Sequence, residues 1–458
     1  MMVSEFIKNK HLANRAGFGI SLQQIAAFEQ QSNADVWQVY SAVREFEPIN
    51  FNRDEVNFDY VTLSKLKAAE KKQIQQRNRQ RNIEINLNFL TAMVHSEDQL
   101  REKMAFFWHG HFACRVVNSK FSVHILNEIR KNALGNFRDL LFAVSKAPAM
   151  LSFLNNQQNK KGHPNENFAR EVMELFTMGR SHYTEADVRE AARAFTGWSY
   201  DKDARFIERK KFHDPGPKTF LGKTGNFDGN AVLDIILEQP ATARFITDKL
   251  YRFLVNEQVD NEIVNSLGKE FYESGYDIKR LLDSIFTSAW FYETKNIGSK
   301  IKSPIELMVG IMRMLPMKVE KPENLIVYQK LLGQMLLYPP NVAGWPSGKA
   351  WIDSSTLLLR MQIPQIWSGL RPLDLNPRED DDLDMGLRQN RKLAKAFKNP
   401  NMSIAWQQIE AAFAGREPTE LLLQKKPSFK QRILEKYAAG NTRMSIIETM
   451  SIPEYQLC

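Results

Sequence analysis

The sequence contains little cysteine: Cys114 and Cys458 are the two cysteines among its 458 residues. Two thiols provide neither a disulfide framework nor a zinc site built from thiolates. A metal in this protein would therefore need other ligands. The sequence identifies no cofactor, and a divalent metal bound by histidine and carboxylate side chains is the one metal centre that it leaves open.

Long hydrophobic runs are missing as well. No apolar stretch approaches the roughly 20 residues that a helix needs to cross a bilayer, so we expect no membrane span. Residues 1–10 lack the apolar run and the small-residue cleavage site of a secretory signal. We therefore expect a cytoplasmic protein, or a periplasmic or extracellular one if the N-terminus is processed.

Catalytic motifs with strong local signatures are also absent. The sequence has no P-loop, dinucleotide-binding fingerprint, nucleophile elbow, His-Glu-x-x-His motif or EF-hand pattern. It leaves open whether the protein is an enzyme.

The composition is that of a folded globular chain. Hydrophobic residues make up 43% and aromatic residues 11% of the sequence, which excludes a disordered or collagen-like protein. A total of 62 Lys and Arg residues against 53 Asp and Glu residues gives a net charge of +9. Because this bias is mild and spread over a large surface, we expect no nucleic-acid partner. For the basic stretch 65–82 we prefer a solvated helix face over a surface that follows phosphates.

Apolar residues recur at helical spacing through most of the sequence, and alternating runs are scarce. This pattern predicts a mainly α protein with a large helical domain and irregular loops. Ser303 and Glu306 form a capping box around Pro304 and predict a helix through Leu315. Between 200 and 230 the periodicity lapses, so we expect a long excursion there with room for a small β-hairpin.

A composition break divides the chain. Residues 371–402 hold an acidic block followed by a basic block, which is typical of a linker or a mobile insertion. We expect residues 1–370 to form the main helical body. Helical spacing returns at 403–458, and we expect this C-terminal segment to pack back on the body.

The first group of candidate site residues lies in the aromatic segment 106–112, where His109 and His111 flank Gly110. In a regular helix, positions i and i+2 point about 200° apart, so the two imidazoles could share one ligand only if Gly110 breaks the helix. One interpretation is structural, with one histidine hydrogen-bonded in the core and the other at a surface. The alternative is a joint acid–base or metal-binding role.

The second group lies in the segment 163–176, which we expect to be helical. At 100° per residue, Asn167, Glu171 and Glu174 fall within about 60° of one another. A stripe that faces solvent would belong to an ordinary amphipathic helix. A stripe that faces inward would need a cation, a shared proton or an arginine such as Arg170, and it would then be either a salt-bridged structural network or a site suited to acid–base chemistry or metal binding.

The third group lies on the irregular loop, where His213 and Asp214 are adjacent. A His-Asp dipeptide on a loop suits the edge of a ligand site, although such dipeptides are common. Alone it is a weak signal.

Several motifs follow one another along the chain. They lie at 11–19, 107–112, 164–175, 183–188, 191–198, 213–214, 218–222 and 340–346. Together they resemble the bacterial domain-of-unknown-function family 1800 over residues 11–455. The resemblance implies a mainly helical protein of a family that is frequently exported and commonly encoded beside a sulfatase-like or phosphatase-like protein of unknown function. That neighbour is the partner that the resemblance suggests.

Two functions fit these observations. The first, which we prefer, is a hydrolase-like enzyme with a His/Glu polar cluster and optional metal assistance, in which imidazoles and acids converge in one hollow. The second is a noncatalytic helical scaffold or accessory protein that binds a partner protein. The candidate catalytic residues are His109, His111, Glu171, Glu174 and His213. The candidate substrate-binding residues are Asn165, Asn167, Arg170, Asp214, Lys218 and Trp345.

Overall fold

The structure of the chain is a computed structural model that describes residues 3–50, 66–373, 402–425 and 441–458. Helices dominate these residues, and their strands pair in three antiparallel two-stranded sheets. The mainly α fold predicted from the apolar spacing is therefore confirmed. No helix of the described part is both long enough and apolar enough to span a membrane.

The chain divides into two compact units. Unit 1 takes its residues from Met1–Val36, Tyr292–Met335 and Pro346–Cys458, and unit 2 from Trp37–Phe291 and Leu336–Trp345. The sequence predicted to be the main body, 1–370, thus contributes to both units. Most of the predicted linker, 371–402, lies outside the described residues, so its character stays a prediction.

Unit 1 is built from short helices and one small sheet. Its helices are α1 Glu5–Ala16, α2 Ile25–Gln30, the first part of α3 Asn33–Ser41, α16 Pro304–Met314, α17 Asn324–Leu331, α18 Ser354–Trp367, α20 Trp406–Phe413, α21 Pro418–Leu422 and α23 Thr442–Met450. Single 3-10 turns cover Leu22–Gln24, Gly348–Trp351 and Pro453–Gln456. Its strands are β5 Met317–Val319 and β6 Met402–Ile404.

Buried cations tie the two ends of the sequence together within unit 1. Arg15, which is 1% exposed, donates to the carbonyl oxygen of Cys458 at 2.6 Å. Lys10 donates to the carbonyl oxygen of Leu423 at 2.7 Å. Hydrogen bonds from long cationic side chains satisfy carbonyls that would otherwise be buried without partners. The described C-terminal residues therefore pack on helix α1.

Unit 2 contains most of the longer helices. They are the second part of α3, α5 Ala68–His95, α6 Gln99–His111, α7 Ser119–Asn132, α8 Phe137–Lys146, α9 Pro148–Phe153, α10 Asn167–Glu171, α11 Glu185–Ala194, α12 Gly229–Leu237, α13 Pro240–Leu254, α14 Asn261–Glu273 and α15 Ile278–Phe286. A π-helix, Val172–Thr177, continues α10. Single 3-10 turns cover Asn156–Gln158 and Lys210–Phe212, and a third, Ala289–Tyr292, lies at the point in the sequence where unit 2 passes into unit 1.

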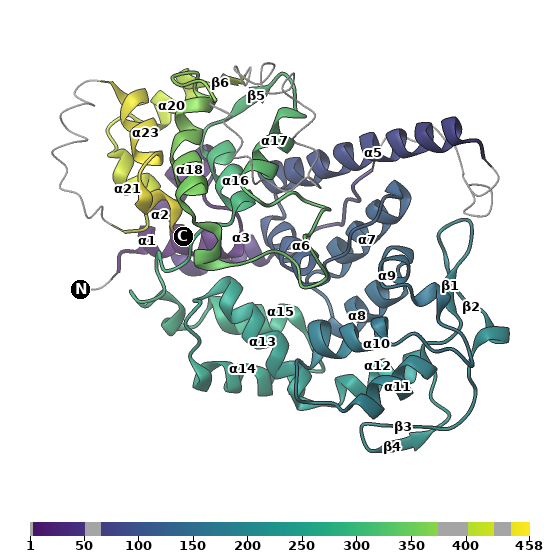
Figure 1. The fold of residues 1–458 in the computed structure, drawn as a ribbon. Helices are drawn as coiled ribbons and strands as arrows, with labels where there is room; N and C mark the ends of the chain where they lie inside the picture. The colour runs from purple at the N-terminus through teal and green to yellow at the C-terminus, as the bar shows by residue number, and fades with distance from the viewer. Residues whose placement is uncertain (1–2, 51–65, 374–401, 426–440) are drawn as a thin grey trace. The chain divides into compact units, whose positions relative to one another are not determined.

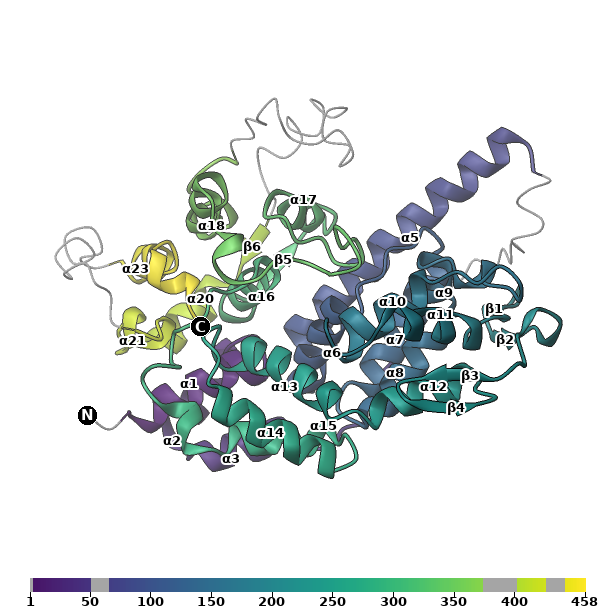
Figure 2. The ribbon, with the colours of Figure 1, turned by 60° about the horizontal axis from the view of Figure 1, so that its bottom comes forward.

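The expected β excursion of unit 2 contains two hairpins. Strands β1 Trp198–Tyr200 and β2 Phe206–Glu208 form the first, and strands β3 Lys218–Phe220 and β4 Lys223–Gly225 form the second. Figure 2 shows the second hairpin beside α11 and α12. Figure 1 shows α13 and α14 lying side by side in the same unit.

Local capping interactions explain several helix starts. Ser303 Oγ accepts from the backbone N–H of Glu306 at 3.3 Å, and the Glu306 carboxylate accepts from the backbone N–H of Ser303 at 2.8 Å. This is the predicted capping box, and α16 begins beside it at Pro304. Thr184 and Asp187 make the equivalent pair of hydrogen bonds at the start of α11. These side chains satisfy backbone donors that have no partner within the helix.

The core of unit 2 is aromatic at the end of α6. The ring of the fully buried Trp108 lies 5.9 Å from that of Phe112 and 5.6 Å from that of Phe137. Trp108 Nε1 donates to the carbonyl oxygen of Ala133 at 3.1 Å, so its polar atom is satisfied. Such rings bury large areas and pack with specific geometry. They fix the end of α6, from which both candidate imidazoles project.

Candidate functional site

Helix α6 positions the two candidate imidazoles. Asp98 caps the start of the helix, and the helix continues through Gly110 to His111. Gly110 therefore does not break the helix, and the two rings leave it in different directions because helical positions are 100° apart. Both side chains are buried, with exposed fractions of 4% for His109 and 6% for His111.

His109 is hydrogen-bonded to the loop 336–345. Its Nε2 atom accepts from the backbone N–H of Leu337 at 3.1 Å, which assigns the ring proton to Nδ1. Burial lowers the pKa of His109 to about 4, so the ring is neutral near pH 7. Leu337 has a positive φ of 68°. That conformation costs a residue with a Cβ about 1–2 kcal/mol, and the bond to His109 helps to hold it.

Three further contacts join the loop 336–345 to the end of α6 and to its neighbour α5. Asn86 Nδ2 donates to the carbonyl oxygen of Leu336 at 2.8 Å, and the ring of Trp345 lies 5.4 Å from that of His109. Gly344 has a φ of 86°, and a Cβ at this position would overlap the carbonyl oxygen of Gly110. Glycine is the residue that fits this approach. The segments 107–112 and 340–345, far apart in sequence, therefore pack together.

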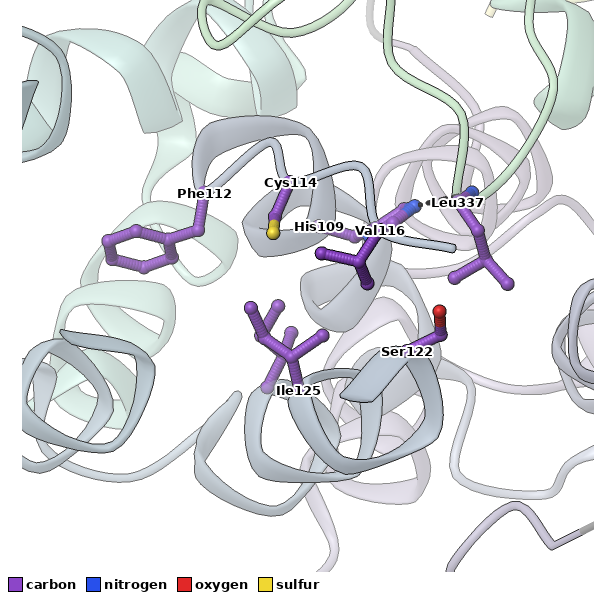
Figure 3. A pocket seen from close by; sticks show the side chains of 8 residues that line it. His109, Phe112, Cys114, Val116, Ser122, Ile125 and Leu337 are labelled. Carbon is purple, nitrogen blue, oxygen red and sulfur yellow. Dashed lines mark hydrogen bonds between the residues drawn. The ribbon is translucent and has the colours of Figure 1, made fainter. Parts of the chain in front are cut away.

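A small hollow adjoins His109 (Figure 3). It is lined by His109, Phe112, Cys114, Val116, Ser122, Ile125, Ile129 and Leu337. In Figure 3 the His109 ring points toward the backbone of Leu337. Burial raises the pKa of the Cys114 thiol, so Cys114 is not a reactive thiolate. The hollow has room for about one water molecule, which is far less than a substrate pocket.

His111 is held by different elements. Its Nε2 atom lies 3.0 Å from the carbonyl oxygen of Phe176, and Lys249 Nζ lies 3.3 Å from its Nδ1 atom. The ammonium group only donates, so Nδ1 accepts and the ring proton is assigned to Nε2, which donates to Phe176. Burial and then the charge of Lys249 lower the pKa of His111 well below its usual range. His111 is therefore a neutral ring of the opposite tautomer to His109.

The π-helix explains why these donors gather here. The last carbonyls of a helix have no partners within it. His111 supplies one partner, and Lys249 Nζ supplies another by donating to the carbonyl oxygen of Leu175 at 3.0 Å. A cation at the C-terminal end of a helix is also favoured by the helix dipole. Burial lowers the pKa of Lys249 to about 8.

The two candidate acids make contacts of another kind. The Glu174 carboxylate accepts from Arg180 Nε at 2.6 Å and from the Tyr183 hydroxyl at 2.8 Å, and these bonds lower its pKa. Burial and then the charge of Glu174 raise the pKa of Glu171. Both side chains are partly exposed. Among the described residues, no hydrogen bond or ion pair joins either acid to the imidazoles of α6.

The remaining candidates near α10 have structural partners. Arg170 donates to both carboxylate oxygens of Glu185 at 2.8 Å. The backbone N–H of Asn167 donates to Asn165 Oδ1 at 3.0 Å, which fixes the start of α10. The backbone N–H of Asn165 donates in turn to Oδ1 of the buried Asn159 at 2.9 Å. These contacts position the start of α10.

The third group forms a closed turn. Arg193 Nε donates to the Asp214 carboxylate at 2.9 Å. Lys218, which is 1% exposed, donates to the carbonyl oxygen of Asp214 at 2.7 Å. His213 Nδ1 lies 3.0 Å from the carbonyl oxygen of Thr196. In this turn Asp214 is therefore ion-paired with Arg193 at the end of α11, and the amine of Lys218 is hydrogen-bonded to backbone carbonyls.

The structure distributes the sequence-predicted residues over three places. It brings His109 to Trp345, Glu171 to the neighbourhood of Glu174, and Asp214 to Lys218. His111 contacts the backbone of Phe176 in the segment that carries Glu171 and Glu174, but no hydrogen bond or ion pair among the described residues joins the imidazoles to these acids. In the described ranges, no group of three or more His, Cys, Asp or Glu side chains is arranged to hold a metal ion.

Three residues that organise these places were not predicted from the sequence. Lys249 lies between the buried residues Ile246 and Leu250 of α13, and a lysine beside an apolar face is a weak signal. Asn159 bridges the start of α10 to the carbonyl oxygen of Ala192 at 2.8 Å and looks like an ordinary loop residue in the sequence. Leu337 carries no local sign of its positive φ.

Comparison with known proteins places the chain in a family. Residues 11–457 match DUF1800, described as a protein of unknown function. The chain belongs to the DUF1800 family. The DUF1800 match extends over nearly the whole chain and confirms the resemblance seen in the ordered motifs. No curated protein and no solved structure matches.

Proposed function

We propose that this DUF1800 protein is a noncatalytic helical accessory protein that binds a partner protein. The observation that carries the proposal is the structural use of both imidazoles. His109 accepts from the backbone of Leu337, and His111 donates to the backbone of Phe176. Neutral, buried rings held in this way are suited to fixing the fold, whereas a general acid or base must reach a substrate and have a pKa near the working pH.

The charged candidates support the same function. Arg170, Glu174 and Asp214 are each paired with another side chain of this protein. Paired charges with matched hydrogen bonds are typical of a structural network. The partner we propose is the sulfatase-like or phosphatase-like protein commonly encoded beside members of this family. That enzyme would supply the chemistry, and this chain would supply a binding surface.

Light scattering after size-exclusion chromatography tests this proposal. An equimolar mixture of the two purified proteins should elute with the summed mass of the complex. A sulfatase-like protein that is not encoded beside the chain serves as the matched control and should elute separately. Separate elution of the proposed pair would show that this partner is wrong.

A second candidate function is a hydrolase that uses two carboxyl groups, and two observations favour it. The pKa of Glu171 is raised while that of Glu174 is lowered, and opposite shifts in neighbouring carboxyl groups are typical of acid–base pairs. The pair also lies where α10 becomes a π-helix, and such irregular turns are frequent at functional sites. In this alternative Glu171 is the acid and Glu174 the base.

Hydrolysis of p-nitrophenyl esters and phosphates tests the alternative. Glu171→Gln should lower the rate at least about 100-fold if Glu171 is a general acid. Glu262→Gln, at an exposed position of α14, serves as the control and should leave the rate unchanged. Elemental analysis of wild type and Glu171→Gln, purified without a metal-affinity tag, tests metal assistance. No hydrolysis above the buffer rate by the wild type would remove this candidate.

A further inference from the structure

The first half of α5 forms an exposed arm. We define the arm as residues 67–80, which comprise the capping residue Lys67 and the first turns of the helix. Within it Ile74 is buried and Asn78 is half-buried, and every other residue is exposed. At 1.5 Å per residue the arm is about 20 Å long. Figures 1 and 2 both show α5 extending beyond α6 and α7.

The C-terminal end of the arm is held by hydrogen bonds to α7. Asn78 Oδ1 accepts from the backbone N–H of Ser119 at 3.0 Å and from its hydroxyl at 2.9 Å. The second half of α5 provides the buried residues Asn82, Ile85, Asn86, Phe89, Leu90, Met93 and Val94. A helix of about 14 residues is marginal in isolation, so the arm depends on this packed half for its order. The exposed side chains of the arm add little to the core and remain available for binding.

The net positive charge of the described part of unit 2 lies on the arm. Its exposed cations are Lys67, Lys71, Lys72, Arg77 and Arg79. Its one acid, Glu70, accepts from the backbone N–H of Lys67 at 2.8 Å as part of the helix cap. In the rest of the described part of unit 2, acidic and basic residues balance each other. The excess positive charge therefore lies on a single projecting helix.

We infer that the arm docks on an acidic surface of a partner protein. A nucleic-acid duplex presents phosphates over a broad surface, and outside the arm this unit has no excess of cations to follow them. A single strand usually stacks on aromatic side chains, and the arm has none. A local acidic patch on a protein is the partner surface that complements the charge of one short basic helix. The inference rests on the proposed function, because it names the surface at which the partner protein is met.

The charge of the arm should act mainly on the rate of association with the partner. Exposed cations attract an acidic partner before contact and raise the association rate, and salt screens this attraction. The arm lacks the exposed aromatic and apolar anchors that slow dissociation at most interfaces. The arm therefore steers the encounter, and its contribution falls as salt is added.

Fluorescence anisotropy with a labelled polyglutamate peptide tests the arm without knowledge of the partner. The arm variant is K71E/K72E/R77E/R79E, and the matched control is K202E/K210E/K211E/K269E, which reverses four exposed lysines elsewhere in unit 2. At low salt we expect the arm variant to weaken peptide binding about tenfold or more, and the control to change it less than about twofold. Circular dichroism should show equal helicity for all three proteins, because the substituted side chains are exposed.

Three outcomes overturn the inference. They are no peptide binding by the wild type, equal losses in the arm and control variants, and binding of a DNA duplex of about 20 base pairs that is about tenfold tighter than that of the peptide at the same salt. The result is independent of the proposed neighbour. Peptide binding through the arm, without a complex in light scattering, would reject that neighbour and keep the arm as an acidic-protein surface.

Discussion

Lys249 donates to Nδ1 of His111 across 3.3 Å and so joins α13 to the end of α6. The same amine donates to the carbonyl oxygen of Leu175 in the π-helix at 3.0 Å. One side chain thus connects three helical segments of unit 2, and the partial burial of this lysine lowers its pKa to about 8. Hydrogen bonds of Lys249 link the end of α6, the π-helix and α13 within unit 2.

Removing the amine of Lys249 should destabilise unit 2. Lys249→Met keeps much of the aliphatic chain but leaves the Leu175 carbonyl and His111 Nδ1 without their donor. We expect the free energy of unfolding to fall by about 1–3 kcal/mol. Urea unfolding followed by circular dichroism measures the change. Lys269→Met, at a side chain that is 77% exposed, is the control, and equal midpoints for both variants would contradict the prediction.

The stability of the protein should fall as the pH drops below 6.5. His109 is neutral when folded because its pKa is depressed from 6.5 to about 4. The unfolded chain binds this proton more readily, so the contribution of His109 is complete above pH 6.5 and is lost as the pH falls towards 4, by about 3 kcal/mol in total. His109→Gln retains an acceptor for Leu337 but does not titrate. Urea unfolding between pH 4 and pH 6.5 should therefore show that the free energy of unfolding depends less steeply on pH in the variant than in the wild type. The same pH dependence in both proteins would contradict a buried neutral His109 ring.

Gly344 should tolerate no side chain. Gly344→Ala places a Cβ against the carbonyl oxygen of Gly110 and also strains a φ of 86°. Gly222→Ala is the matched control, because its φ is 78° but nothing lies within 4 Å of the added Cβ. The control should lose about 1–2 kcal/mol from backbone strain, and Gly344→Ala should lose clearly more. Equal thermal midpoints for the two variants would contradict the close packing of the loop 336–345 against the end of α6.

A buried ion pair should contribute more to the free energy of unfolding than an exposed one. Arg130 donates to both oxygens of Glu102 at 2.6 and 2.9 Å, and both side chains are at most 5% exposed. Arg130→Met leaves a buried carboxylate without its partner and should cost about 3–5 kcal/mol. Arg170→Met breaks the more exposed pair with Glu185 and should cost less than about 1 kcal/mol. Denaturant titrations measure the free energy of unfolding of both variants. A larger loss in Arg170→Met than in Arg130→Met would contradict the prediction.

The helices were predictable because their signals are local. The capping box of Ser303 and Glu306 marks the start of α16 directly in the sequence. The hairpins between 200 and 230 were also indicated, by a lapse of periodicity with glycine and proline. Their number and register depend on pairing and did not follow from composition.

The contacts that the candidate site residues make in the structure were harder to predict from the sequence. The stripe of Glu171 and Glu174 assumed 100° per residue, but the helix becomes π-helical at Val172 and this step no longer holds. One of the two hydrogen-bond partners of His111 is Lys249, which is 138 positions away in the sequence. Such contacts depend on tertiary packing, and no local pattern encodes them.

The tautomers of His109 and His111 test the structural role most directly. Nitrogen-15 NMR of protein labelled in its 8 histidines, assigned with His109→Gln and His111→Gln, measures the protonation of each ring nitrogen. Near pH 7 we expect two neutral rings of opposite tautomers, with the proton on Nδ1 of His109 and on Nε2 of His111. Rings that titrate near pH 6.5, or that exchange between both tautomers, would contradict the proposal that these imidazoles serve the fold.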